Sequence, residues 1–196
     1  MDLRLAKFNA LLKSVKLPPG QLTLDDMFQL YYYSQDSPLS VELGTLQGLG
    51  AAILAINSDM VVTVDLFEDV ESVDTPSREH YVSCLKTHPR EYSVVSKYLA
   101  AFGNIQVIKN LSYLESSNFG TGSIHTLFVD ADHSYEGVKK DLESYYQKVS
   151  RYFLLHDYYS GWPGVEEASV EFFLDKPVRF IEREFLHTSI QVVEKI

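Results

Sequence analysis

The sequence predicts a single domain of the α/β class, in which a doubly wound parallel sheet is covered by helices on both faces. Short apolar runs alternate with helical patterns along residues 39–174, and this alternation is typical of strand-helix-strand units. The chain has 196 residues, which is room for one well-packed domain. Hydrophobic residues make up 45% and charged residues 22%, so the composition supplies a core and excludes a disordered or collagen-like chain.

Two helices are expected before this alternating region. Apolar residues recur at three- to four-residue spacing over residues 3–15, and a Pro-Pro pair then stops the pattern. A second helix begins after Thr23, whose hydroxyl can cap it, with two aspartates in its first turn. We therefore expect residues 1–36 to form an amino-terminal helical appendage that packs on a main domain of residues 37–196.

The main domain is expected to begin with a strand and to alternate from there. The expected strands are residues 39–43, 60–66, 105–109, 124–129 and 152–155, and the expected helices are residues 46–57, 76–102 and 134–149. A further helix over residues 165–174 precedes two strand patterns, 178–183 and 189–194, with no helix between them. These two strands predict an antiparallel hairpin that closes one edge of the sheet.

The first strand-to-helix junction is rich in glycine and reads Val41-Glu42-Leu43-Gly44-Thr45-Leu46-Gln47-Gly48. Doubly wound sheets bind ligands at the carboxyl ends of their strands, and glycines there let the backbone approach a ligand closely. A dinucleotide fingerprint needs a second glycine where this chain has Leu46. The loop therefore suits a nucleoside without phosphates better than NAD. The alternative is that Gly44 and Gly48 serve only tight turning and helix packing.

An acidic side chain, Asp65, ends the second expected strand. A carboxylate at that position can accept hydrogen bonds from the two hydroxyls of a ribose. The alternative is a turn former or helix cap, which is common for an aspartate after a strand.

Carboxylates and histidines follow two further strands. Asp130 and His133 come after strand 124–129, and His156 and Asp157 end the next strand. Adjacent parallel strands lie about 4.8 Å apart, so Asp130 and Asp157 could face one site. Such groups could hold a hard divalent cation or deprotonate a hydroxyl. In the alternative reading His133 bonds within a turn, and the backbone satisfies His156, which is the reading we favour for His156.

These residues resemble the class I S-adenosylmethionine-dependent methyltransferases, in particular the small O-methyltransferase-like branch. The resemblance covers about residues 39–174 and is carried by the first junction, Val64-Asp65, Asp130-Ala131-Asp132-His133-Ser134-Tyr135-Glu136-Gly137 with Asp141, and His156-Asp157-Tyr158. It implies a Rossmann-like sheet of seven strands whose last strand is antiparallel, in agreement with the closing hairpin.

The resemblance implies S-adenosylmethionine as the cofactor, with Glu42 and the loop of residues 44–48 around its methionine part and Asp65 at its ribose. The residues it assigns to cofactor binding are Glu42, Gly44, Thr45, Gly48, Asp65, Leu66, Asn110, Ser112 and Asp130. The acid that often contacts adenine is missing after the third strand, where Asn110 or Ser112 could substitute.

The resemblance also implies catalytic roles for His133, as general base, and for Asp130. In metal-dependent relatives the acids that match Asp130 and Asp157 ligate a magnesium-type ion, so the resemblance extends to Mg²⁺ at these two residues. Methyl transfer is an in-line displacement on an activated sulfonium, and the protein aligns the acceptor and raises the nucleophilicity of its hydroxyl. The expected reaction is therefore O-methylation of a small molecule, such as a sugar or natural product.

Two other functions stay open at this point. The usual Gly-Gly turn before the fifth strand is replaced by residues 147–151, which contain no glycine. This departure and the missing adenine acid leave room for a binding protein that keeps the fold without catalysis. A nicotinamide oxidoreductase is the other alternative, which Leu46 disfavours.

Charge and composition indicate the partners and the compartment. Lys and Arg number 17 against 27 Asp and Glu, a net charge of −10, which argues against a phosphate-binding face and hence against nucleic acid. The single cysteine, Cys84, excludes an internal disulfide framework. We see neither a secretory signal nor the roughly 20 apolar residues of a membrane span. We expect a cytoplasmic protein with a small-molecule acceptor and no membrane partner, and a homo-oligomer is compatible with the sequence.

Overall fold

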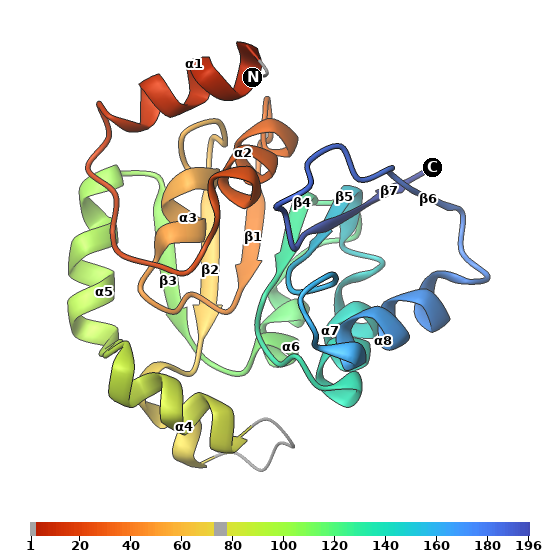
Figure 1. Cartoon of the computed structure of the whole chain (residues 1–196). Helices are drawn as coiled ribbons and strands as arrows, with labels where there is room; N and C mark the ends of the chain where they lie inside the picture. The colour runs from red at the N-terminus through yellow and green to blue at the C-terminus, as the bar shows by residue number, and fades with distance from the viewer. Residues whose placement is uncertain (1–2, 73–77) are drawn as a thin grey trace.

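The computed structural model describes residues 3–72 and 78–196, and these residues form a seven-stranded sheet between two layers of helices (Figure 1). The strands are β1 Ser40–Leu43, β2 Val61–Asp65, β3 Ile105–Lys109, β4 Ile124–Val129, β5 Val149–Leu155, β6 Val178–Phe180 and β7 Gln191–Lys195. Their order is β3-β2-β1-β4-β5-β7-β6. Strands β1 to β5 are parallel, and β7 runs antiparallel to both of its neighbours. The predicted fold class and its closing hairpin are confirmed.

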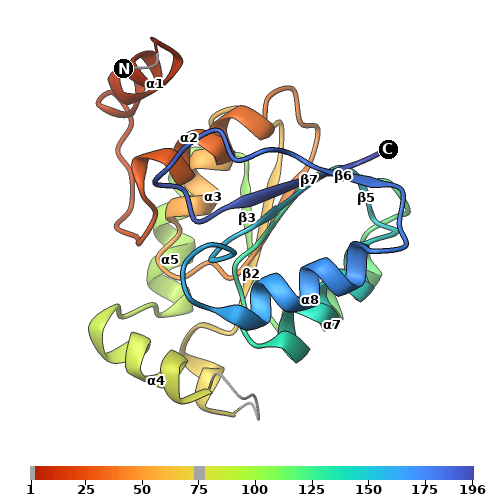
Figure 2. The same ribbon diagram turned by 45° about the vertical axis from the view of Figure 1, so that its right-hand side comes forward.

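Helices cover both faces of the sheet, as Figure 2 shows for α7 and α8 on one side and α2 and α3 on the other. The α-helices are α1 Leu3–Leu12, α2 Leu24–Tyr33, α3 Leu49–Leu54, α4 Arg78–Thr87, α5 Tyr92–Leu99, α6 Ser112–Glu115, α7 Tyr135–Tyr145 and α8 Pro163–Phe173. Single 3-10 segments lie at Phe67–Ser72, Ala100–Phe102 and Ser116–Asn118. Among the described residues, no helix is long and apolar enough to cross a membrane.

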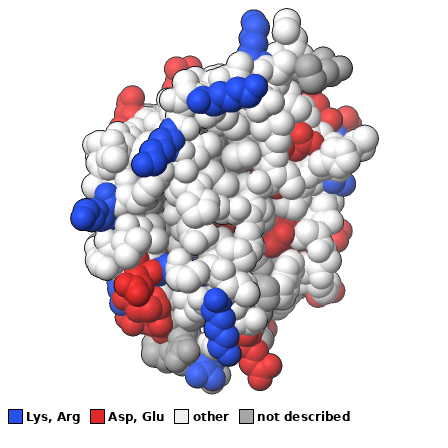
Figure 3. Space-filling model, turned by 60° about the vertical axis from the view of Figure 1, so that its left-hand side comes forward, with Lys and Arg blue, Asp and Glu red and all other residues white. Residues whose placement is uncertain are grey.

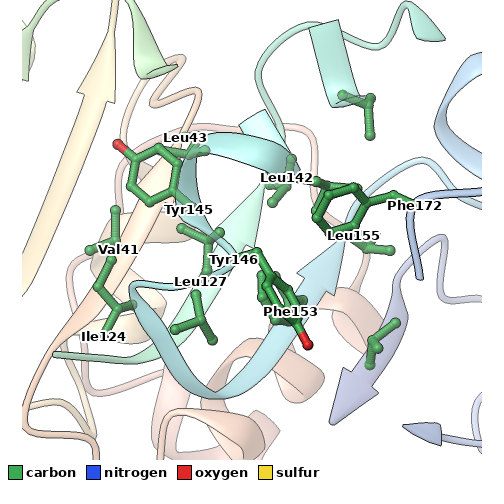
Figure 4. Packing of buried hydrophobic residues seen from close by; sticks show 14 of the residues in the cluster. Val41, Leu43, Ile124, Leu127, Leu142, Tyr145, Tyr146, Phe153, Leu155 and Phe172 are labelled. Carbon is green, nitrogen blue, oxygen red and sulfur yellow. The ribbon is translucent and has the colours of Figure 1, made fainter. Parts of the chain in front are cut away.

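Alternate side chains of each strand enter opposite cores, because successive residues of a strand point to opposite faces. On the α7 and α8 side, Leu127 and Phe153 pack with Leu142 and other residues of these helices (Figure 4). The ring of Tyr146 stacks on Phe153 with centroids 6.1 Å apart. Leu154, the next residue of β5, joins the other core, in which α3 and α5 pack.

The amino-terminal helices share that second core. Phe8 of α1 and Phe28 of α2 are both buried in it, and their rings meet at 5.5 Å in an edge-on contact. Helix α2 begins as predicted after Thr23, whose side chain and that of Asp26 form a reciprocal capping box. The second carboxylate oxygen of Asp26 accepts a hydrogen bond from the Thr188 hydroxyl at 2.8 Å. Helix α2 is therefore bonded to the segment that leads into β7.

The structure corrects two of the predicted helices. The pattern over residues 76–102 forms two helices, α4 and α5, and its first two residues lie outside the described part of the chain. Pro89 lies between them, and a proline there removes a backbone donor and pushes the residue before it out of the helical region. The helix expected from residue 46 begins only at Leu49, because Leu46 and Gly48 have φ of 49° and 98°.

The bounds of several other elements also differ by a few residues from the prediction, and strand β6 ends at Phe180 rather than at residue 183. Helix α7 ends at Tyr145, and strand β5 begins earlier than expected, at Val149. Helix α6 was not predicted. These changes leave the predicted strand ends in place, so the groups expected at the edge of the sheet do reach it.

Candidate functional site

A cavity of about 520 Å³ lies at the carboxyl ends of the parallel strands. Two groups of the predicted residues line this cavity. One group comes from the carboxyl ends of β1, β2 and β3 and the loops that follow them, and the other comes from the loops after β4 and β5. The predicted residues in its lining are Glu42, Gly44, Thr45, Asp65, Leu66, Asn110, Ser112, Asp130, His133 and Asp157. Gly48 is not part of this lining. It caps α3, and a Cβ there would lie 2.9 Å from the side chain of Leu99, which is the packing role left open above.

The first loop, residues 44–48, is folded onto the carboxylate of Asp65. One oxygen of Asp65 accepts the backbone N–H groups of Thr45 at 2.8 Å and Leu46 at 2.9 Å. The other accepts the N–H of Phe67 at 2.7 Å, and the guanidinium Nε of Arg90 lies 3.9 Å from it. Asp65 therefore holds the loop in place and keeps capacity for one further hydrogen bond, since a carboxylate has about four acceptor positions.

Gly44 lets the loops after β1 and β4 meet. Its φ is 93°, and a Cβ at this position would lie 2.0 Å from the carbonyl oxygen of Asp130. The left-handed backbone and the lack of space both require glycine. The two groups of cavity residues therefore lie side by side.

Glu42 is buried beneath the first loop. Thr63 donates a hydrogen bond to its carboxylate and lies 2.5 Å, oxygen to oxygen, from the hydroxyl of Thr45. Burial raises the pKa of Glu42 well above its usual range, and the bond from Thr63 offsets only part of that rise. A buried carboxyl with a raised pKa is often found at a functional site.

Four side chains form what we call the Asp-His cluster: Asp130, His133, His156 and Asp157. Each offers one ligand atom, and these atoms all lie within 4.8 Å of one another. His133 Nε2 lies 3.2 Å from Asp130, and His133 Nδ1 lies 3.4 Å from Asp157. His156 Nδ1 lies 2.9 Å from Asp130 and 3.5 Å from Asp157. Asp130 and Asp157 thus face the same two imidazoles, as the strand-end reasoning expected of a shared site.

The charges of the cluster are strongly coupled. Burial alone would raise the pKa of Asp130, but the imidazoles of His156 and His133 outweigh it and leave this pKa below its ordinary value. Burial likewise opposes ionisation of Asp157, yet the same imidazoles hold its pKa far below the usual range. Burial alone would lower the pKa of His156, but the carboxylates of Asp130 and Asp157 outweigh burial and raise this pKa well above its ordinary value.

A family of methyltransferase domains, Methyltransf_24, matches residues 41–158, which is more than half of the chain. The chain belongs to this methyltransferase family. The matched region runs from β1 to the residue after Asp157, so it contains the first loop, Asp65 and the whole Asp-His cluster. A search of the curated proteins finds no match.

Three solved structures share the fold of this methyltransferase at low sequence identity. TomG, an O-methyltransferase from Streptomyces achromogenes solved with SAM, is 13% identical at a TM-score of 0.64, with 100% of this chain and 90% of that chain covered. An O-methyltransferase from Bacillus cereus solved with SAH is 15% identical at 0.59, with 100% and 92% covered. An rRNA methylase from Streptococcus thermophilus is 14% identical at 0.55, with 90% and 98% covered.

Asn110 and Ser112, where the adenine acid is missing, are both held by carboxylates of the methyltransferase itself. Asn110 donates to Glu115 at 2.5 Å, and the hydroxyl of Ser112 donates to Asp141 at 2.5 Å. Asp141 is buried and lines the cavity, and burial raises its pKa to about 7.

Sequence reasoning missed three residues of the site. His156 was expected to be satisfied by the backbone, but its ring enters the Asp-His cluster. Its position beside Asp157 was the one available signal. Asp26 of α2 brings a carboxylate oxygen to 4.0 Å from His156 Nε2. Tyr81 of α4 uses its hydroxyl to donate to Ala131 at 2.5 Å and to accept from the N–H of His133 at 2.9 Å. Neither Asp26 nor Tyr81 lies in a motif, so the sequence held no signal for them.

Proposed function

We propose that this methyltransferase uses S-adenosylmethionine to methylate a hydroxyl of a small molecule, such as a sugar or natural product. The observation that carries the proposal is one shared cavity, which is lined on one side by the loop that Asp65 anchors and on the other by Asp130 and His133. One side suits a nucleoside and the other suits proton removal.

Asp65 is the proposed contact to the ribose. Three backbone N–H groups occupy its two oxygens, and the remaining acceptor position can take one ribose hydroxyl. The backbone of the first loop lies beside it, with Gly44 allowing close approach. Leu66, Asn110 and Ser112 line the adjacent part of the cavity, which we assign to the adenine.

His133 is the proposed general base. Its ring lies between the carboxylates of Asp130 and Asp157, which stabilise the imidazolium that forms when the ring takes up a proton. Trp162 packs edge-on against it with centroids 5.2 Å apart. The hydroxyl proton passes to the imidazole while the hydroxyl oxygen bonds to the methyl carbon. S-adenosylmethionine supplies that methyl on a positively charged sulfonium, whose carbon–sulfur bond breaks to leave a neutral thioether.

The Mg²⁺ implied at Asp130 and Asp157 does not fit the groups present. Magnesium requires a near-ideal octahedral shell of oxygen atoms. Here each of the two carboxylates has an imidazole nitrogen within 3.5 Å. No step of the proposed reaction therefore uses Mg²⁺.

A small acceptor is favoured over nucleic acid. The net charge is −10, and Figure 3 shows one face of the molecule on which lysine and arginine side chains are scattered among uncharged and acidic surface. A protein that binds the phosphates along a nucleic-acid strand needs its lysine and arginine side chains gathered on one surface.

The cytoplasmic location remains part of the proposal, supported by the single cysteine. The division at residue 36 and a homo-oligomer also remain proposals.

Calorimetry with S-adenosylhomocysteine and methyl transfer to a panel of catechols, phenols and glycosides test this function. We expect His133→Ala to bind S-adenosylhomocysteine like the unmodified protein and to lose about 10²- to 10⁴-fold in transfer rate. The exposed His187→Ala serves as the matched control. No heat with S-adenosylhomocysteine would overturn the cofactor assignment. Full transfer by His133→Ala would overturn the base. Cofactor binding without transfer to any acceptor would favour the binding protein without catalysis.

A further inference from the structure

Arg90, in the turn between α4 and α5, is a buried cation in the lining of the cavity. The residue is 6% exposed. Its Nε lies 3.9 Å from Oδ1 of Asp65, a distance beyond that of a hydrogen bond. This contact is its one ion pair to the residues that the structure describes, and none of them accepts a hydrogen bond from the guanidinium. Arg90 therefore has an opposite charge nearby but no acceptor for its N–H groups.

A buried guanidinium without hydrogen bonds indicates a ligand. Arginine carries five N–H donors in a planar fork and keeps its charge in proteins. Buried polar atoms normally have a partner, and burying a charge costs much free energy unless it is both paired and hydrogen-bonded. Asp65 supplies the pairing charge for Arg90 but not the hydrogen bond. A molecule bound in the cavity is the group that can accept these N–H groups.

We infer that Arg90 donates from its guanidinium to a ribose hydroxyl of the bound cofactor, so that Asp65 and Arg90 hold the two hydroxyls together. This inference rests on the proposed use of S-adenosylmethionine. Asp65 has one acceptor position left beside its three backbone N–H groups, so it can take the proton of one hydroxyl only. A hydroxyl oxygen also accepts hydrogen bonds, and the guanidinium beside Asp65 can therefore bind the second hydroxyl.

The segments after β1 and β2 hold the turn that carries Arg90. Gln47, in the loop after β1, donates from Nε2 to the carbonyl of Pro89 at 3.3 Å. Glu68, in the segment after β2, accepts the backbone N–H of Tyr92 at 2.9 Å. The turn is thus bonded on both sides of Arg90 to the segments that surround the proposed ribose site. The break between α4 and α5 therefore places a cation at this site.

The carboxylate of the methionine part is the competing acceptor, because a guanidinium also binds carboxylates strongly. The position of Arg90 favours the ribose, since its Nε faces the acid assigned to the ribose. Three ligands separate these two acceptors. 5′-Methylthioadenosine keeps the ribose and lacks the methionine carboxylate, and its 2′-deoxy and 3′-deoxy forms each lack one hydroxyl.

The test is calorimetry of these ligands with the full chain and with Arg90→Met, which keeps an unbranched side chain and removes its donors. We expect Arg90→Met to bind 5′-methylthioadenosine about 10- to 100-fold more weakly. Removal of one of the two hydroxyls should cost at least about fivefold less affinity in Arg90→Met than in the unmodified protein, because the group that binds it is gone. The matched control is Arg179→Met, whose exposed arginine pairs with Glu194 and should leave all affinities unchanged.

Three results would overturn this inference alone. One is equal affinity of the unmodified protein for all three ligands, a measurement that needs no variant to fold. The second is an equal loss for all three ligands in Arg90→Met, which would mean that Arg90 acts only by neutralising Asp65. The third is a loss confined to S-adenosylhomocysteine, which would assign Arg90 to the methionine carboxylate.

The proposed function fails in a different way. No binding of S-adenosylhomocysteine or 5′-methylthioadenosine by the unmodified protein would overturn the cofactor assignment, and the role of Arg90 with it. Arg90→Lys keeps a positive charge beside Asp65 and loses the planar fork, so it serves for the same comparison if Arg90→Met does not fold.

Discussion

The carboxylate of Asp65, at the end of β2, accepts the backbone N–H of Thr45 at 2.8 Å, in the loop after β1. Leu46 donates to the same oxygen at 2.9 Å. Leu46 has φ of 49°, a conformation that a leucine adopts only when its surroundings impose it. The acid that we assign to the ribose is thus also the group that shapes the loop beside the cofactor.

Asp65→Ala should therefore reduce both stability and cofactor binding. The loss leaves three backbone N–H groups without their acceptor, at a cost of about 2–4 kcal/mol in the free energy of unfolding. We expect affinity for S-adenosylhomocysteine to fall by more than about tenfold. Urea unfolding and calorimetry measure the two effects, with the exposed Asp59→Ala as control. Unchanged affinity in folded Asp65→Ala would show that neither the loop nor the ribose depends on this acid.

Gly50 makes room for Glu42. A Cβ at Gly50 would lie 2.0 Å from the Glu42 carboxylate and 3.1 Å from the ring of Phe128. Gly50→Ala should cost about 1–3 kcal/mol, since the crowded groups must shift. The cost should be smaller in a Glu42→Ala background, because the closest contact is then gone, and a double-mutant cycle by urea unfolding measures this coupling. Equal costs in both backgrounds would contradict the steric explanation.

The sequence was most informative where local chemistry decides the structure. Thr23 was expected to cap a helix, and its side chain accepts a backbone N–H at the start of α2, as that of Ser134 does at the start of α7. Asp65 and Asp130 were expected at strand ends on one edge of the sheet, and they line one cavity. Hydrophobic periodicity and helix capping both depend on residues that are close together in the sequence, which is why these features could be predicted.

Contacts between distant segments could not be predicted in this way. Asp26 reads as a first-turn acid of a helix, and only the folded chain brings it to His156. The hydroxyl of Tyr81 accepts a hydrogen bond from the backbone N–H of His133. Tyr81 lies in α4, which the sequence pattern did not separate from α5. Pro89 lies inside the helical pattern of residues 76–102, and the structure divides that pattern into α4 and α5 there.

Tyr145 supports the loop that carries Ser112. Its hydroxyl donates to the Ser112 carbonyl at 2.8 Å, and its buried ring belongs to the same hydrophobic cluster as Leu43 (Figure 4). Tyr145→Phe leaves that carbonyl without this donor, so we expect a loss of about 1–3 kcal/mol in the free energy of unfolding. Tyr146→Phe is the matched control, since Tyr146 packs through its ring on Phe153. Equal losses in the two variants would argue against a specific role for the bond to Ser112.

Asp141 should make stability depend on pH in an unusual direction. Burial raises its pKa from 3.8 to about 7, so between about pH 4 and pH 7 the folded chain keeps a proton that the unfolded chain has lost. Folding then takes up a proton, and the stability that depends on this group falls as pH rises through that window and is level above it. Asp141→Asn has no such proton to lose, and an amide can still accept the hydrogen bond from Ser112.

The free energy of unfolding of Asp141→Asn, relative to the unmodified protein, should therefore increase by on the order of 2 to 4 kcal/mol from pH 4 to pH 7. Urea unfolding at several pH values measures this difference. Asp59→Asn, at an exposed position, is the matched control for the substitution itself. A flat difference for Asp141→Asn would mean that the folded chain holds Asp141 ionised. The Ser112 hydroxyl would then outweigh burial, since its bond to the carboxylate lowers the pKa.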